Sequence, residues 1–598
     1  MRIAFQRIPN VCRIARVAWQ RSNPWQQLGC KRTFDPNIIV LNVRDGDKMK
    51  KKNKEICCFL VFTIALLIVA CFHEPWYDEA EAWQMARGAS IRELLFYIPH
   101  YEGHPALWYL ILAVPAKLGV PYEVGLKLIS CTAAVCSCAL ILFYSPFPKI
   151  IRCILPFHYF FFYQYAVVSR PYCLMVLCFW LMACFYRRKD EKPLRFIIPM
   201  ILLCMLSGYG IVLSGGICIA WVWDICREKE WKFFRPEFWK DRRILCLVIL
   251  LIVAILMILE ILPYPDTIAT SKQAANPLII RMFYTFFAML ADSTVITILK
   301  GAMYLSQAPV AVPIMIFGVV MGGILLIGLI GISNGKNLHH FLIPYSLFAL
   351  FSALVYFCAH HMGLVLVFAV YWLWISWEEP DRFAVWKRMT SKVTLTDQDR
   401  KTVKKVGVAA GVLMFAIPVF WTIAGSYLDI RYPFYYGRDA AAFIREHGLE
   451  NAVVYGEWDI AIPKDAPENG DVYEYMNTEL IARPVAILPY FKHNFVVNMG
   501  GDSHGYALHR KPGSQENREK IEEWKKLPAP EVIIGPMAIG YLTDDEQAGA
   551  NYVAVYEYQP FLNIWKSNLS IYNLGYKEYI YLRKDLLETY GLKELKLY

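Results

Sequence analysis

A series of long apolar runs between residues 56 and 424 constrains this chain more than any other feature. A helix needs roughly 17 to 25 mainly apolar residues to cross a bilayer, and most of the runs are that long. The run 196–226 is too long for one helix, and Gly208-Tyr209-Gly210 is predicted to break it into a hairpin. The runs are 56–72, 106–118, 122–144, 150–168, 171–186, 196–226, 244–262, 311–332, 341–358, 361–377 and 406–424.

The composition excludes most soluble classes of protein. Hydrophobic residues make up 57% of the chain and charged residues 19%, whereas soluble domains are about 45–50% apolar and about 25% charged. The 17 cysteines all lie at or before Cys358, most of them inside apolar runs. We therefore expect them to pack as small hydrophobic side chains, without a disulfide framework or a zinc site.

The basic residues predict which side of the membrane each connection occupies. Residues 1–54 hold 13 Lys and Arg against three Asp directly before the first apolar run, which indicates a cytoplasmic anchor and not a nucleic-acid surface. The composition up to Phe34 is typical of a transit peptide. We favour the alternative, a true start at Met49, because the lysines that follow it give a first membrane helix its usual basic flank.

Three connections rich in Lys and Arg, 187–195, 227–243 and 381–405, are placed inside. The acidic connection 73–105 then lies outside, together with Arg170. Three apolar runs separate these two segments, but two segments on one face need an even number of crossings between them. One of the three runs is therefore expected to be a partial or interfacial helix, which leaves about eleven crossings. The run 106–118 is the shortest of them.

Beyond residue 428 the pattern changes to short β-rich pieces alternating with helical segments, such as 452–455 and 437–447. The predicted fold is therefore a polytopic α-helical membrane protein with a C-terminal extracytoplasmic α/β domain. Its parts are a basic N-terminal segment 1–54, a transmembrane domain 55–428 with an outer loop 73–105, and a soluble domain 429–598.

The outer connection carries the candidate chemistry. It begins His73-Glu74-Pro75-Trp76-Tyr77-Asp78-Glu79-Ala80-Glu81-Ala82-Trp83 and ends Tyr101-Glu102-Gly103-His104-Pro105-Ala106-Leu107-Trp108-Tyr109. Ionisable groups facing a membrane bundle are costly to desolvate, so a functional role is the default hypothesis. The alternative is a solvated acidic loop with aromatic residues at the membrane interface.

An Asp-Glu pair just after the first membrane helix, followed some 25 residues later by Glu-x-His-Pro-x-Leu-Trp-Tyr, resembles the GT-C superfamily of polyprenyl-phosphate-sugar glycosyltransferases. Protein O-mannosyltransferases and aminoarabinose transferases belong to this superfamily. The specific part of the resemblance covers residues 73–109. A weaker match runs through Val168-Ser169-Arg170-Pro171-Tyr172 and His361-Met362-Gly363.

The resemblance implies an inverting transfer of sugar at the outer face, with Asp78 as general base and Glu79 beside it as catalytic residues. Glu79, Glu81 and Glu102 become candidates for binding sugar hydroxyls or for holding Asp78. Arg170 suits the leaving phosphate, although a snorkelling interfacial arginine is the alternative. His104, His360 and His361 share that face, and we include His104 and His361 with Glu102 and Arg170 as substrate-binding candidates.

Directly after Arg170 near the membrane there is no Asp-x-Asp pair, which departs from the metal-using oligosaccharyltransferase pattern, so no required metal and no other cofactor is predicted. The expected partners are a polyprenyl-phosphate-sugar lipid, an envelope acceptor and membrane lipids, and nucleic acid is not expected. The predicted location is the cell membrane, with a cytoplasmic N-terminus. Two other functions stay open. A secondary transporter would need charges at mid-membrane and repeat symmetry. A catalytically silent lipid-binding or scaffold protein of the same fold is the third hypothesis.

Overall fold

The computed structural model describes the chain from the first membrane helix onward, with gaps. The described residues are 53–232, 234–267, 277–296, 311–355, 359–391, 396–456, 483–499, 505–506, 508–510, 515, 519, 523, 526–535, 551–558 and 578–596. The predicted start at Met49 lies outside them. Contacts join Glu55–Tyr598 into one compact unit.

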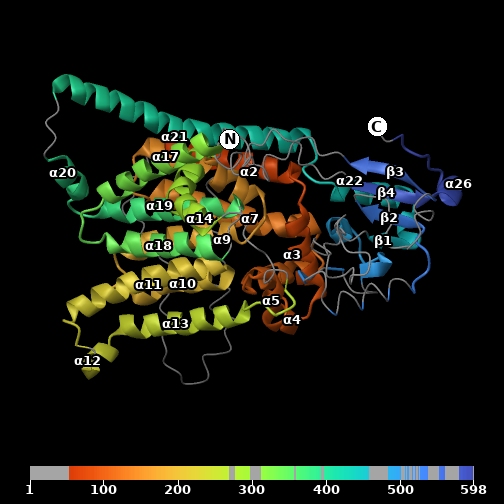
Figure 1. Ribbon diagram of the computed structural model, residues 1–598, viewed down its shortest axis with the longest axis horizontal. Coiled ribbons are helices and arrows are strands. Elements are labelled where there is room, and N and C mark those ends of the chain that lie inside the picture. Colours follow the sequence, from red (N-terminus) through yellow and green to blue (C-terminus); the bar gives the residue numbers. More distant parts are fainter. Residues whose placement is uncertain are drawn as a thin grey trace, which may run out of the picture. The chain divides into compact units, whose positions relative to one another are not determined.

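Long apolar helices dominate this unit, as Figure 1 shows. Five of them are long and apolar enough to cross a membrane: α2 (Asn53–Phe72), α7 (Tyr122–Tyr144), α11 (Gly208–Glu228), α13 (Arg242–Glu260) and α21 (Asp397–Arg431). Shorter apolar helices accompany them: α6 (Leu107–Lys117), α9 (Tyr172–Tyr186), α10 (Pro193–Leu206), α17 (Ala311–Gly331), α18 (His339–Leu354) and α19 (Met362–Glu378). These helices are those of a helical membrane protein, as the apolar runs predict.

The run 196–226 is divided into two helices as predicted, but the break lies at Ser207, and the predicted Gly208-Tyr209-Gly210 forms the first turn of α11. Ser207 has an extended backbone between α10 and α11, and its hydroxyl accepts a hydrogen bond from the Tyr209 backbone N–H. A Cβ on Gly210 would lie 1.9 Å from the Leu203 backbone oxygen, so only glycine fits at this close approach.

The helix α6 is too short to cross a bilayer on its own. Its 11 residues span only about 17 Å at 1.5 Å per residue, against a hydrocarbon core of about 30 Å. After α7 the chain returns through α8 (Lys149–Ile154), η4 (Leu155–Phe157) and the π-helix η5 (Phe160–Val167) to Arg170. Glu55, in the first turn of α2, pairs with Lys149 and Arg152. The two basic residues therefore lie at the N-terminal end of α2.

The outer connection is helical in the structure and not an open loop. It forms α3 (Tyr77–Gly88), α4 (Ile91–Phe96) and α5 (Pro99–Glu102). Asp78 and Glu79 occupy the first turn of α3, where carboxylates interact favourably with the helix dipole. The other short helices are α12 (Pro236–Trp239), α14 (Leu278–Phe283), η7 (Tyr284–Ala288), α15 (Met289–Ala291), η8 (Asp292–Ile296), η9 (Ala359–His361) and α20 (Ala384–Thr390).

After α21 the described chain forms a mixed four-stranded sheet in the order β1-β2-β4-β3. The strands β1 (Val454–Gly456) and β2 (Val532–Gly535) are parallel, and β4 (Glu578–Arg583) runs antiparallel to both β2 and β3 (Tyr552–Tyr558). The helix α22 (Gly437–Glu446) buries Ala440, Ala441 and Ile444. Short turns complete the described part: η10 (Leu449–Asn451), η12 (Arg483–Ala486), η13 (Leu488–Tyr490), η14 (Val497–Met499), η15 (Lys584–Leu586) and α26 (Leu587–Tyr590).

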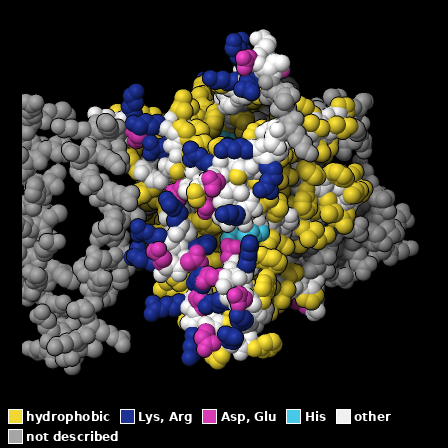
Figure 2. All heavy atoms as spheres, turned by 90° about the vertical axis from the view of Figure 1, so that its left-hand side faces the viewer, with side chains coloured by type: hydrophobic (Ala, Val, Ile, Leu, Met, Phe, Trp, Pro, Cys, Tyr) yellow, Lys and Arg dark blue, Asp and Glu magenta, His cyan; other side chains and the backbone are white. Residues whose placement is uncertain are grey.

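The basic connections meet at one end of the bundle. Arg243, at the start of α13, lies 3.3 Å from Asp190 in the α9–α10 connection and 2.6 Å from Glu228 at the end of α11. Figure 2 shows this end, where Lys and Arg side chains lie among Asp and Glu side chains next to hydrophobic surface. The connections 187–195 and 227–243 therefore share one face.

A labelling experiment tests the predicted sidedness of this face. Cysteine introduced at the exposed Lys387 of α20 is expected to react with a membrane-impermeant maleimide only after lysis, and cysteine at the exposed Lys492 in intact cells. The wild-type chain gives the background from its own cysteines. The reverse pattern would contradict the topology.

Candidate functional site

Asp78 and Arg170 lie together although 91 residues separate them along the chain. Arg170 Nη1 donates a hydrogen bond to the Asp78 backbone oxygen at 3.0 Å, and Nη2 lies 3.5 Å from Asp78 Oδ2. The Arg170 side chain is 15% exposed and that of Asp78 is 27% exposed, so both groups stay accessible. Burial lowers the pKa of Arg170, but Asp78 and the other acidic neighbours, Tyr172, Tyr109 and Glu79, together outweigh it, and the pKa is raised.

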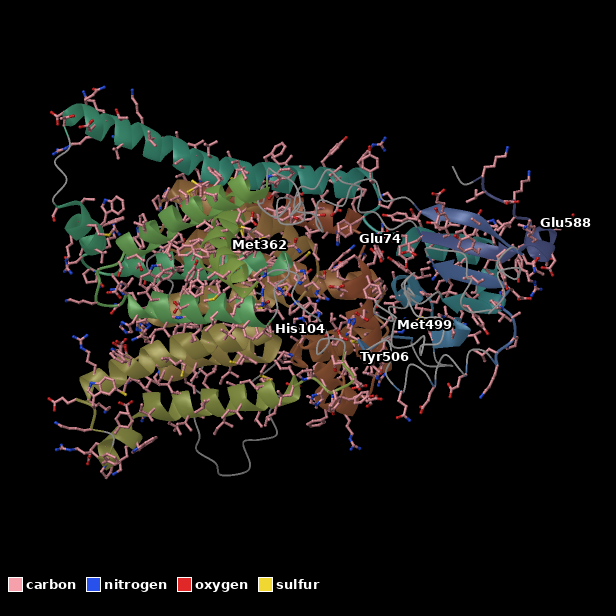
Figure 3. All side chains as sticks on the ribbon, in the orientation of Figure 1. Glu74, His104, Met362, Met499, Tyr506 and Glu588 are labelled. Atoms are coloured by element: carbon pink, nitrogen blue, oxygen red, sulfur yellow. The ribbon has the colours of Figure 1, made fainter. Side chains whose placement is uncertain are left out.

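Two histidines of the predicted set lie near this pair. Burial lowers the pKa of His104 to about 3, with a further contribution from Arg170. Burial also lowers the pKa of His361 well below its usual value. Both imidazoles are therefore neutral at pH 7 and offer hydrogen bonds without charge. The His361 ring lies against that of Tyr209, with 4.4 Å between centroids. Figure 3 labels His104 within its surroundings.

Glu81 and Glu102 meet His509, which sequence reasoning did not identify. His509 Nε2 lies 3.5 Å from Glu81 Oε2 and 3.8 Å from Glu102 Oε1. Burial raises the pKa of Glu102 to about 8, and the Glu81 carboxylate adds to this effect. One donor atom from each of the three residues lies within 4.8 Å of the others, and two carboxylates with an imidazole form a donor set that fits a divalent cation.

Glu79 faces the protein interior. Its side chain is fully buried, and it accepts hydrogen bonds from the backbone N–H groups of Ser169 at 2.6 Å and Trp76 at 3.1 Å. It therefore joins the residue before Arg170 to the start of α3, where Asp78 lies. This geometry suits a positioning role more than contact with a substrate.

A buried histidine completes the support of Glu79. His73 Nδ1 lies 2.9 Å from Asp429 Oδ2, and His73 Nε2 lies 3.3 Å from Glu79 Oε2. Burial alone would lower the pKa of His73, but the two carboxylates outweigh it and raise the pKa to about 9. His73 is therefore an imidazolium at neutral pH between two carboxylates. We name Asp429, His73 and Glu79 the buried triad.

The chain after α21 binds the outer helices through a second set of polar contacts. The Arg438 guanidinium donates to both oxygens of Glu123, at 2.9 and 2.7 Å, and its backbone N–H donates to Glu74. Arg87 of α3 donates to the Phe491 backbone oxygen at 2.9 Å. Burial raises the pKa of Glu74 to about 8; Figure 3 labels this residue. These contacts join the chain after α21 to Glu74, to α3 and to the start of α7.

Comparison with known proteins provides no relative from which a function could be transferred. No protein-family model, no curated protein and no solved structure matches the chain. Function is therefore inferred from the motifs of residues 73–109 and from the contacts made by Asp78, Arg170 and their neighbours.

The buried triad predicts a specific dependence of stability on pH. Because the pKa of His73 is raised to about 9 in the folded chain from about 6.5 when unfolded, its contribution is complete below pH 6.5 and is lost as the pH rises through 9. We expect it to contribute on the order of 3 kcal/mol. Chemical unfolding of wild type and His73→Gln between pH 6 and 10 measures the difference. The half-buried His447 supplies the matched control, His447→Gln. Equal slopes in wild type and His73→Gln would contradict the assignment.

Proposed function

We propose that the chain is a GT-C-type membrane glycosyltransferase that transfers a sugar from a polyprenyl-phosphate donor to a cell-envelope acceptor at the extracytoplasmic face. The observation that carries this proposal is the contact between the accessible Asp78 carboxylate and the Arg170 guanidinium, brought together from two segments at one end of the bundle. The resemblance of residues 73–109 supplies the reaction class. The proposal includes about eleven crossings, a cytoplasmic N-terminus and a C-terminal domain outside the cell membrane.

The reaction needs one base and one phosphate-binding cation. Asp78 takes the proton of the acceptor hydroxyl, whose oxygen forms the new bond to the anomeric carbon. The bond between that carbon and the phosphate oxygen breaks, and its electron pair leaves with the phosphate, which Arg170 binds through charge-assisted hydrogen bonds. A single displacement inverts the anomeric configuration.

Without substrate, Asp78 neutralises Arg170. A donor phosphate competes for the same guanidinium, because arginine binds carboxylate and phosphate oxygens through the same fork of N–H donors. When the phosphate takes the place of Asp78 on Arg170, the carboxylate loses its cation and becomes a stronger base. Donor binding therefore prepares the base for the acceptor.

The neighbouring residues have supporting roles. The neutral His104 and His361 provide hydrogen bonds to sugar or phosphate without adding charge. Glu102 and Glu81 bind sugar hydroxyls, or together with His509 hold a divalent cation that would supply positive charge near the phosphate. Glu79 and His73 position Asp78 and Arg170 and do not contact substrate.

Two substitutions separate the roles of base and phosphate ligand. Asp78→Asn is expected to lower the turnover number by about 10²- to 10⁴-fold while donor binding persists, because the amide keeps the shape but cannot take a proton. Arg170→Ala is expected to weaken donor binding by about 10- to 100-fold and to lower turnover as well. Transfer from a polyprenyl-phosphate sugar, together with donor binding, is measured on the purified chain.

Arg92→Ala is the matched control, because Arg92 is an exposed arginine of α4. It should behave as wild type. Transfer by Asp78→Asn at the wild-type rate would contradict the assignment of the base. Movement of a solute across proteoliposomes without any transfer would favour the transporter instead.

A further inference from the structure

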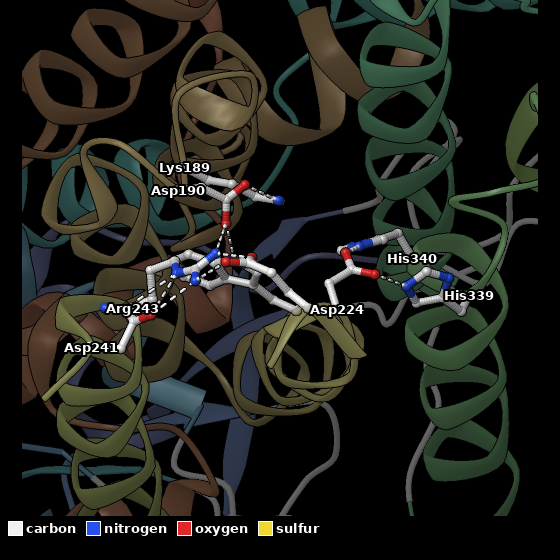
Figure 4. A network of polar contacts seen from close by, with 9 residues as sticks. Lys189, Asp190, Asp224, Asp241, Arg243, His339 and His340 are labelled. Atoms are coloured by element: carbon white, nitrogen blue, oxygen red, sulfur yellow. Dashed lines mark hydrogen bonds and ion pairs between the residues drawn. The ribbon is translucent and has the colours of Figure 1, made fainter. Parts of the chain in front are cut away.

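A second cluster of ionisable side chains lies away from the Asp78–Arg170 pair, at the C-terminal end of α11 and the start of α18. Asp224 belongs to the last turns of α11, and His339 and His340 are the first two residues of α18. Figure 4 shows the two imidazole rings directed at the one carboxylate. The proposed transfer reaction makes no use of these three residues.

The donor atoms converge. His339 Nε2 lies 2.8 Å from Asp224 Oδ1, and His340 Nε2 lies 2.6 Å from Oδ2. One donor atom from each residue lies within 4.8 Å of the other two. The Asp224 side chain is 32% exposed and that of His339 is 20% exposed, so an ion can enter from solvent.

We propose that Asp224, His339 and His340 form a binding site for a divalent transition metal of the zinc class, which joins α11 to α18. Two imidazole nitrogens and one carboxylate oxygen suit zinc and its neighbours, whereas magnesium and calcium prefer oxygen ligands alone. Three protein ligands leave a fourth position for water.

The surrounding cations do not oppose such an ion, because carboxylates neutralise them. Lys189 Nζ lies 2.7 Å from Asp190 Oδ2. The Arg243 guanidinium pairs with Glu228 at 2.6 Å and with Asp241 at 2.8 Å. Figure 4 shows these pairs as a network beside Asp224. The Asp224 carboxylate has only the two imidazoles as partners in the ion pairs of the described chain.

The competing arrangement is a hydrogen-bonded clamp in which both imidazoles donate Nε2–H to Asp224. Metal binding moves each proton to Nδ1. In His340 that atom is buried and makes no hydrogen bond within the described residues. Ligand histidines normally donate this proton to an acceptor, and losing such an acceptor weakens metal binding about 10- to 100-fold. We therefore expect zinc binding weaker than that of a site with a complete second shell.

Zinc content distinguishes the metal site from the clamp. The full-length chain is purified in detergent, stripped with EDTA, incubated with zinc chloride and desalted, and zinc per chain is measured by mass spectrometry. The double variant His339→Gln/His340→Gln keeps side-chain N–H donors for Asp224 but lacks the imidazole ligands, so folding and metal binding are tested separately. His447→Gln serves as the matched control, because it removes an imidazole that lies outside both three-residue donor sets.

The proposal predicts that wild type and His447→Gln hold one zinc per chain more than His339→Gln/His340→Gln, and that zinc raises the melting temperature of the first two proteins by more than that of the double variant. The cysteines are unchanged in all three and give the same background. Equal zinc content in wild type and His339→Gln/His340→Gln would overturn the proposal, as would equal thermal shifts. Neither result depends on the proposed transfer reaction.

Discussion

The arrangement of α3 beside the ends of α2 and α21 depends on one buried charge, the His73 imidazolium between the carboxylates of Asp429 and Glu79. A charge inside a protein is tolerated only when it is paired and hydrogen-bonded, and here three charged groups supply partners for one another. Removing the imidazole would leave two carboxylates without their cation. The triad also joins three elements, because His73 follows α2, Asp429 lies near the end of α21 and Glu79 lies in α3.

The contacts at Asp78 and Arg170 follow from this constraint. Glu79 accepts the Ser169 backbone N–H, so the same carboxylate that holds His73 also fixes the backbone next to Arg170. Arg87 and Arg438 then fix α3 and α7 against the chain that follows α21. The side chains proposed to meet substrate are therefore held by groups that do not meet it. At the other end of the bundle, Asp224, Arg243 and their partners join the helices independently of the triad.

Sequence patterns predict the parts of this molecule that depend on local chemistry. Apolar runs give the helices, the run 196–226 divides at Ser207, one residue before the predicted break, and the shortest of the apolar runs forms the short helix α6. The pairing of His73 with Asp429 could not be predicted, because they lie 356 positions apart and no periodicity relates such distant positions. His509 was missed for the same reason, and the strand order β1-β2-β4-β3 depends on contacts that single strands do not reveal. His73 is a polar residue directly after an apolar helix, and this position is the local signal that could have identified it as a structurally important residue.

The most direct test of the account is an experimental structure of the chain in a lipid nanodisc with a bound polyprenyl phosphate. The account predicts that the phosphate group lies on the Arg170 guanidinium, that the Asp78 carboxylate has turned away from it, and that the contacts of His73 with Asp429 and Glu79 are unchanged. A phosphate bound elsewhere, with the contact between Asp78 and Arg170 intact, would contradict the account.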